Sequence, residues 1–119
     1  MARILVVDDA AFMRKVITDT LTAAGHQIAG EAANGDQAVQ LYRELRPDLV
    51  TLDITMPDKD GLTALTEIRS YDPAAKVIMC SALGQEPKVI AAVKAGAHDF
   101  LVKPINRDKL LETITRILG

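Results

Sequence analysis

Residues 3–9, Arg-Ile-Leu-Val-Val-Asp-Asp, contain a continuous apolar run, Ile4 to Val7, that ends at two acidic residues, Asp8 and Asp9. A strand that is apolar on both faces is typical of a parallel sheet covered by helices on both sides. Three further runs of the same kind follow along the chain: Leu49 to Leu52, Val77 to Cys80, and Phe100 to Val102. These four runs predict four strands of one parallel sheet.

The segments between the runs carry apolar residues at helical spacing. Three such stripes are Val16, Ile17 and Leu21; Ala38, Leu41, Tyr42 and Leu45; and Leu110, Leu111, Ile114, Ile117 and Leu118. Residues that end helices follow four of the segments, at Gly25, Pro47, Pro73 and Gly96. A less apolar segment, Gln27 to Glu31, fits between the first two helices as an edge strand.

Strand and helix thus alternate five times, and right-handed crossovers of this kind build a parallel sheet. We expect an α/β fold with a five-stranded parallel sheet of order 2-1-3-4-5 and helices on both faces. The length suits one compact domain, so residues 1–119 are predicted to form a single unit.

Charge and apolar patterning argue against several classes of protein. The formal net charge is -2 and no basic stripe is visible, which argues against binding to nucleic acid. The apolar runs are too short to span a membrane and no secretory signal precedes them, so we expect no membrane insertion and a cytoplasmic location. Cys80 ends an apolar run, which favours a buried, inert thiol.

Polar side chains stand at the carboxyl ends of the apolar runs: Asp8 and Asp9, then Asp53, Ser81 and Lys103. In a parallel sheet these ends share one edge, so the five side chains are expected to converge. Singly, each acid could be a helix cap or a turn residue, and Ser81 is uninformative. Together they favour a functional site. The peptide bond between Lys103 and Pro104 is a candidate for the cis form, which would orient the lysine side chain.

This cluster suits metal-dependent phosphoryl chemistry. Three neighbouring carboxylates repel one another unless a cation lies among them, and an all-oxygen site favours Mg²⁺. Asp53 is the candidate nucleophile, because aspartate carboxylates can form aspartyl phosphates. Lys103 could pair with one phosphoryl oxygen and Ser81 could donate a hydrogen bond to another, which supplies the positioning and charge neutralisation that phosphoryl transfer requires.

Over its whole length the chain resembles the receiver domains of two-component response regulators, a flavodoxin-like family. The motifs that carry the resemblance are Asp8-Asp9, Asp53, Met56-Pro57, Asp60-Gly61, Ser81-Ala82 and Lys103-Pro104. The resemblance implies that Asp53 is the phosphoacceptor and that Asp53 and Lys103 are the catalytic pair. It implies that Mg²⁺ is bound directly by Asp9 and Asp53, through water by Asp8, and by the backbone carbonyl of Thr55.

The resemblance also implies a switch, in which Ser81 moves toward the phosphoryl group and Phe100 turns inward. The other interpretation of Phe100 is an ordinary core aromatic. Within the family the likeness is greatest to stand-alone chemotaxis regulators, carried by residues 8–14, 53–57 and 80–85. It implies a monomeric switch rather than a turnover enzyme, with a histidine kinase as phosphodonor and a phosphatase as a further partner. The output would pass from the fourth helix, fifth strand and fifth helix to the flagellar motor switch protein.

Other interpretations share parts of this pattern. A receiver of another two-component system or of a phosphorelay, whether stand-alone or excised from a longer regulator, would have the same site. A haloacid dehalogenase-type enzyme would place a second Asp where this chain has Thr55, and an FMN carrier would place a phosphate-binding loop where it has Asp8 and Asp9. Neither Thr55 nor Leu83 carries an acid or amide that could orient a hydrolytic water, so the sequence does not predict how long the phosphorylated state lasts.

Overall fold

The computed structural model describes residues 2–119, in which five strands and five helices alternate. The strands are β1 (Arg3–Val7), β2 (Gln27–Ala32), β3 (Leu49–Asp53), β4 (Val77–Ser81) and β5 (Asp99–Val102). The helices are α1 (Ala11–Ala23), α2 (Gly35–Leu45), α3 (Gly61–Tyr71), α4 (Glu86–Lys94) and α5 (Arg107–Leu118). The sheet order is β2-β1-β3-β4-β5 and every pairing is parallel, which confirms the predicted fold.

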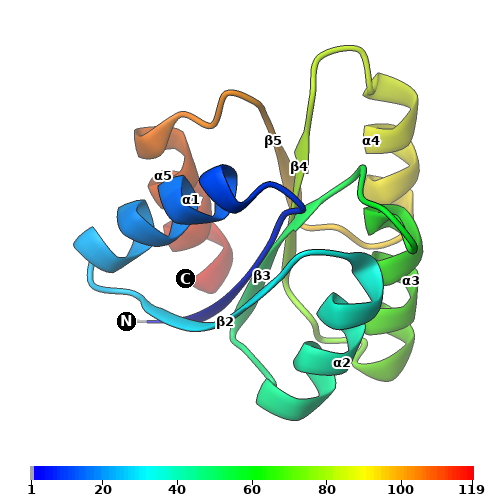
Figure 1. Cartoon of the computed structure of the whole chain (residues 1–119), viewed down its shortest axis with the longest axis horizontal. Helices are drawn as coiled ribbons and strands as arrows, with labels where there is room; N and C mark the ends of the chain where they lie inside the picture. Colours follow the sequence, from blue (N-terminus) through cyan, green and yellow to red (C-terminus); the bar gives the residue numbers. More distant parts are fainter. Residues whose placement is uncertain (1) are drawn as a thin grey trace.

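The helices form two layers, with α1 and α5 on one face of the sheet and α2, α3 and α4 on the other (Figure 1). Alternate residues of a strand point to opposite faces. In β1, Ile4 and Val6 therefore pack with residues of α1 and α5, while Leu5 and Val7 pack with residues of α2, α3 and α4. Burial on both faces explains why the inner strands are continuously apolar.

The edge strand and the helix ends agree with the sequence pattern. β2 lies at one edge of the sheet, and most of its residues are partly or fully exposed. Gly25 and Gly96 follow α1 and α4 with positive φ angles of 90° and 107°, a conformation that glycine adopts without steric strain. Within residues 2–119, no helix is long and apolar enough to cross a membrane.

Three helices begin at residues whose side chains accept a hydrogen bond from a backbone N–H three positions on: Asn34, Asp60 and Asn106. The capping position of α1 is Ala10, which offers no such acceptor. Asp8 Oδ1 instead accepts from the backbone N–H of Ala10 at 2.9 Å. Asp8 therefore does not cap α1 itself, because its side chain binds the backbone N–H of Ala10, one residue before the helix begins.

Candidate functional site

Three carboxylates meet at the carboxyl edge of the sheet. β1 and β3 are neighbours, so Asp8 and Asp53 emerge side by side, and Asp9 follows Asp8. Carboxylate oxygens of the three residues lie within 4.8 Å of one another. Asp8 and Asp53 are buried, with 1% and 4% of their surface exposed, whereas Asp9 is exposed. The donor set is entirely oxygen and open to solvent on the Asp9 side, so it fits a hard cation such as Mg²⁺.

The ammonium group of Lys103 lies between the two buried carboxylates. Its Nζ is 2.8 Å from Asp8 Oδ2 and 3.2 Å from Asp53 Oδ2. Burial opposes the charge of Lys103, but its hydrogen bond to Asp8 and the charges of both carboxylates together raise its pKa above the usual value. The Lys103–Pro104 peptide bond is cis, as the sequence indicated.

The carboxyl group of Asp53 is harder to ionise than an ordinary aspartate. Burial is the main cause and the neighbouring charge of Asp8 is the second, and together they raise its pKa to about 6. Lys103 and a backbone N–H from Thr55, 3.4 Å from Asp53 Oδ1, act in the opposite direction. Two buried acids thus share one ammonium group, which leaves a net negative site suited to a divalent cation.

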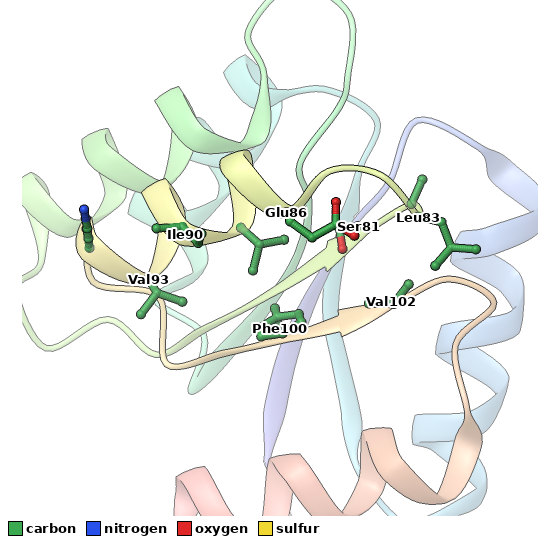
Figure 2. A pocket seen from close by; sticks show the side chains of 10 residues that line it. Ser81, Leu83, Glu86, Ile90, Val93, Phe100 and Val102 are labelled. Atoms are coloured by element: carbon green, nitrogen blue, oxygen red, sulfur yellow. The ribbon is translucent and has the colours of Figure 1, made fainter.

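Ser81 and Phe100 lie outside this cluster. Ser81 is buried at the end of β4, where it lines a hollow of about 450 Å³ between α4 and β5. Figure 2 shows Phe100 on β5 opposite Ile90 and Val93 on α4 across this hollow, with Ser81, Leu83 and Val102 toward one end. Phe100 is 39% exposed, so the interpretation as an ordinary core aromatic is wrong.

Thr55 lies beside Asp53, as expected, but its hydroxyl has a partner that the sequence did not indicate. Gln85 Nε2 donates to Thr55 Oγ1 at 2.5 Å, and Gln85 Oε1 accepts from the backbone N–H of Ala82 at 2.7 Å. No local pattern could have shown this, because Thr55 and Gln85 are 30 residues apart and meet only through the pairing of β3 with β4.

Arg14 is a second residue that the sequence pattern did not indicate. From α1 its Nη1 donates to the backbone carbonyl of Asp8 at 2.7 Å, and its Nε pairs with Glu31 at 3.2 Å. Arg14 therefore ties α1 to the ends of β1 and β2 and positions the backbone of Asp8. Cys80, in contrast, agrees with the prediction, since it is buried and burial is the main reason that its pKa rises to about 12.

The fold and the acidic edge of the sheet are those of a response regulator receiver domain. Residues 4–115 match the family described as the response regulator receiver domain, and the chain belongs to that family. This membership removes the dehalogenase and FMN-carrier alternatives.

Similarity to individual proteins extends over nearly the whole chain. The chemotaxis protein CheY of Bacillus subtilis is 57% identical over 117 residues, which cover 98% of each chain. Protein CcdB of the same organism is 56% identical over 119 residues, covering 100% of this chain and 99% of that one. CheY in a CheX-CheY-BeF3-Mg²⁺ complex from Borrelia burgdorferi superposes with a TM-score of 0.94 at 42% identity, over 98% of this chain and 89% of that one. The chain is therefore close to CheY.

Proposed function

We propose that this protein is a phosphoacceptor switch, in which Asp53 takes a phosphoryl group from a phosphohistidine of a histidine kinase. One observation carries the proposal: the buried Asp53 carboxylate lies within reach of two further carboxylates and is hydrogen-bonded to Lys103. A bond forms between an Asp53 oxygen and phosphorus while the bond from phosphorus to the histidine nitrogen breaks. Burial keeps bulk water away from the reacting carboxylate.

The residues present fit a magnesium ion, with carboxylates from Asp8, Asp9 and Asp53 and the backbone carbonyl of Thr55 as its protein ligands. When bound, Mg²⁺ would neutralise charge on the phosphoryl oxygens and on the acids. Lys103 already lies 3.2 Å from Asp53, so its ammonium is placed to pair with a phosphoryl oxygen on that residue. A relative that carries both Mg²⁺ and BeF3, a phosphoryl analogue, in its structure supports this assignment.

The output surface that we propose is the face of α4, β5 and α5. Seven large apolar side chains are exposed in residues 2–119, and five of them line the hollow between α4 and β5: Leu83, Ile90, Val93, Phe100 and Val102. A gathered apolar surface of this kind marks an interaction site more often than scattered residues do. Ser81 lies at one end of the same hollow, so its movement toward Asp53 would reshape the surface and let Phe100 turn inward.

Chemotaxis is the setting that we propose, with the flagellar motor switch protein as the output partner. The similarity to CheY of several bacteria supports it. A role in another two-component pathway or a phosphorelay remains the second candidate, because a relative with a different name, Protein CcdB, is similar over the same length. Four properties stay predictions from the sequence: a cytoplasmic location, a monomeric state, a single domain and the absence of turnover enzyme activity.

Mass spectrometry after incubation with acetyl phosphate and Mg²⁺ tests the acceptor. We expect the mass of one phosphoryl group on the wild-type protein and on Asp60→Asn, and no addition on Asp53→Asn. Asp60→Asn is a matched control, since it also converts an acid of the β3–α3 segment to an amide and leaves a residue able to cap α3. Phosphorylation that persists unchanged in Asp53→Asn would refute the assignment.

A further inference from the structure

The side-chain amide of Gln85 joins two loops that end at the candidate site. Its Nε2 donates to the hydroxyl of Thr55, in the segment after β3, and its Oε1 accepts from the backbone N–H of Ala82, in the segment after β4. Under the proposed function, the first segment carries a metal ligand and the second follows Ser81. One side chain therefore connects the metal-binding loop with the switch loop.

This contact is not a by-product of helix capping. Gln85 occupies the N-terminal capping position of α4, and its backbone carbonyl accepts hydrogen bonds from Lys88 and Val89. Its side chain does not cap the helix and instead spans the gap to Thr55. Both polar atoms of the amide are thus used in holding the β4–α4 segment to the β3–α3 segment.

The position of Ser81 shows why this connection matters. Ile78 packs with residues of α1 and α5, while Val77 and Met79 pack on the other face of the sheet. By strand alternation Ser81 follows Val77 and Met79, and it lines the hollow beside α4. Asp53 lies two residues along from Thr51 and four from Leu49, on the face of α1 and α5. Because Ser81 and Asp53 follow opposite faces of the sheet, we expect the end of β4 to move when a Ser81 hydroxyl approaches a phosphoryl group on Asp53.

We propose that Gln85 is a latch: its side-chain amide holds the β4–α4 segment in the resting arrangement and must release Thr55 or Ala82 before Ser81 reaches the phosphoryl group. This inference rests on the proposed function of Asp53. Gln85 is a positioning residue rather than a catalytic one, because it contacts neither Asp53 nor Lys103. The β4–α4 segment has two arrangements under this proposal: a resting one, in which Gln85 contacts Thr55 and Ala82, and an activated one, in which Ser81 reaches the phosphoryl group. The Gln85 amide shifts the equilibrium between them toward the resting arrangement.

Removing the latch should make the activated arrangement easier to reach. Hydrogen bonds between neutral, partly exposed groups contribute modestly, so we expect Gln85→Ala to tighten the binding of beryllium fluoride by about fivefold. Thr55→Val should have a similar effect, since it removes the hydroxyl that accepts from Gln85 Nε2 but keeps the backbone carbonyl. Because both changes remove the hydrogen bond between Gln85 and Thr55, the double variant should gain little beyond Gln85→Ala alone.

Calorimetric titration with beryllium fluoride and Mg²⁺ tests the latch in the full chain. The variants are Gln85→Ala, Thr55→Val and their combination, with Lys88→Ala as an exposed control on the first turn of α4. NMR signals of the Ala82 backbone N–H and of the Gln85 side-chain amide report directly on release of the contact. Urea unfolding of each variant without beryllium fluoride measures its overall stability. This measurement separates a shift from the resting to the activated arrangement from a general loss of stability.

Tighter binding by both single variants, a non-additive double variant and an unchanged control would support the latch. Equal affinity in all variants, weaker binding by Gln85→Ala, or an Ala82 signal that does not move when beryllium fluoride binds would overturn it. If the wild-type protein itself binds no beryllium fluoride, the proposed phosphoacceptor function fails, and the latch fails with it. The two failures are therefore distinguishable.

Discussion

The carboxylate of Asp53 is buried next to that of Asp8, and both contact the single ammonium group of Lys103. Two buried negative charges with one positive partner leave the folded protein with uncompensated charge. Burial is the main cause, and the charge of Asp8 the second, that raises the pKa of Asp53 to about 6. At this residue the protein gives up some stability, and the negative site that results is suited to the divalent cation proposed above.

This imbalance predicts how stability depends on pH in protein free of divalent cations. Because folding raises the pKa of Asp53, the folded state holds this proton more tightly than the unfolded chain does. The resulting stabilisation is full below the ordinary aspartate pKa and is lost as the pH rises through about 6. In buffer with EDTA at neutral pH, Asp53→Asn should therefore raise the free energy of unfolding by about 1–2 kcal/mol, after allowance for solvent screening.

Thermal and urea unfolding of wild type, Asp53→Asn and the matched control Asp60→Asn at acidic and neutral pH measure this effect. The advantage of Asp53→Asn should shrink at acidic pH, where the wild-type carboxyl is protonated, and Mg²⁺ should stabilise the wild type more than the variant. An advantage that is equally large for Asp60→Asn, or that grows on acidification, would contradict the prediction.

Thr51 lies two positions before Asp53 on β3. Its hydroxyl is buried, and within residues 2–119 it is the one buried side-chain polar atom without a hydrogen-bond partner. Thr51→Val keeps the shape and removes the unpaired group, so it should stabilise the protein by about 1 kcal/mol in urea unfolding. Thr20→Val is the contrasting control, because the Thr20 hydroxyl donates to the backbone carbonyl of Val16 at 2.8 Å. A loss of stability in Thr51→Val would show that its hydroxyl has a partner in solution.

At the scale of elements, the N-terminus of α3 is packed directly against the end of β3. The backbone N–H of Gly61 donates to the carbonyl of Ile54 at 2.7 Å. A Cβ atom on Gly61 would lie 2.0 Å from the backbone oxygen of Asp53, far inside any real contact. The motif Asp60-Gly61 thus has two physical functions, since Asp60 caps the helix and Gly61 lets the helix approach the backbone of the phosphoacceptor candidate.

Gly61→Ala is therefore expected to displace either α3 or Asp53. We predict a loss of more than about 2 kcal/mol in the free energy of unfolding, because overpacking against backbone cannot relax through a rotamer change. Affinity for Mg²⁺ and beryllium fluoride should also fall. Gly25→Ala is the control: Gly25 has a positive φ, but a methyl group added there would meet no atom within 4 Å, so the change should cost only about 1–2 kcal/mol and leave ligand affinity unchanged. Equal ligand affinity in Gly61→Ala and wild type would contradict the packing argument.

At the scale of the whole molecule, the sheet separates the acidic site from the apolar hollow. By strand alternation Asp8, Asp53 and Lys103 follow residues that pack with α1 and α5. The hollow lies between α4 and β5 (Figure 2). The two are joined at the strand ends, where the backbone N–H of Lys103 donates to the carbonyl of Ser81 at 2.7 Å. This hydrogen bond is a direct contact between the end of β5, beside the acids, and the end of β4, beside the hollow, as the proposed switch would require.

This separation predicts that output can be removed without harming the acceptor. Ile90→Ser replaces a side chain that is 56% exposed in the hollow, so the free energy of unfolding should change by less than about 0.5 kcal/mol. Phosphorylation by acetyl phosphate should persist, while binding of the phosphorylated protein to purified motor switch protein should weaken by about tenfold or more. Phe12→Ser is the control, because Phe12 is 75% exposed on α1, outside the hollow. Equal loss of binding in both variants would refute the proposed output face.

The sheet, its strand order and the acidic edge could all be predicted from the sequence. Continuous apolar runs, helical stripes and helix-ending residues are local signals, and in a parallel sheet the strand ends must share one edge. The face of the sheet on which each polar side chain lies, and its partners, could be known only from the folded structure. That structure placed Lys103 between Asp8 and Asp53, turned Ser81 toward α4, and brought Gln85 onto Thr55. These contacts depend on strand register and loop paths between residues far apart in the chain, and no local spacing encodes them.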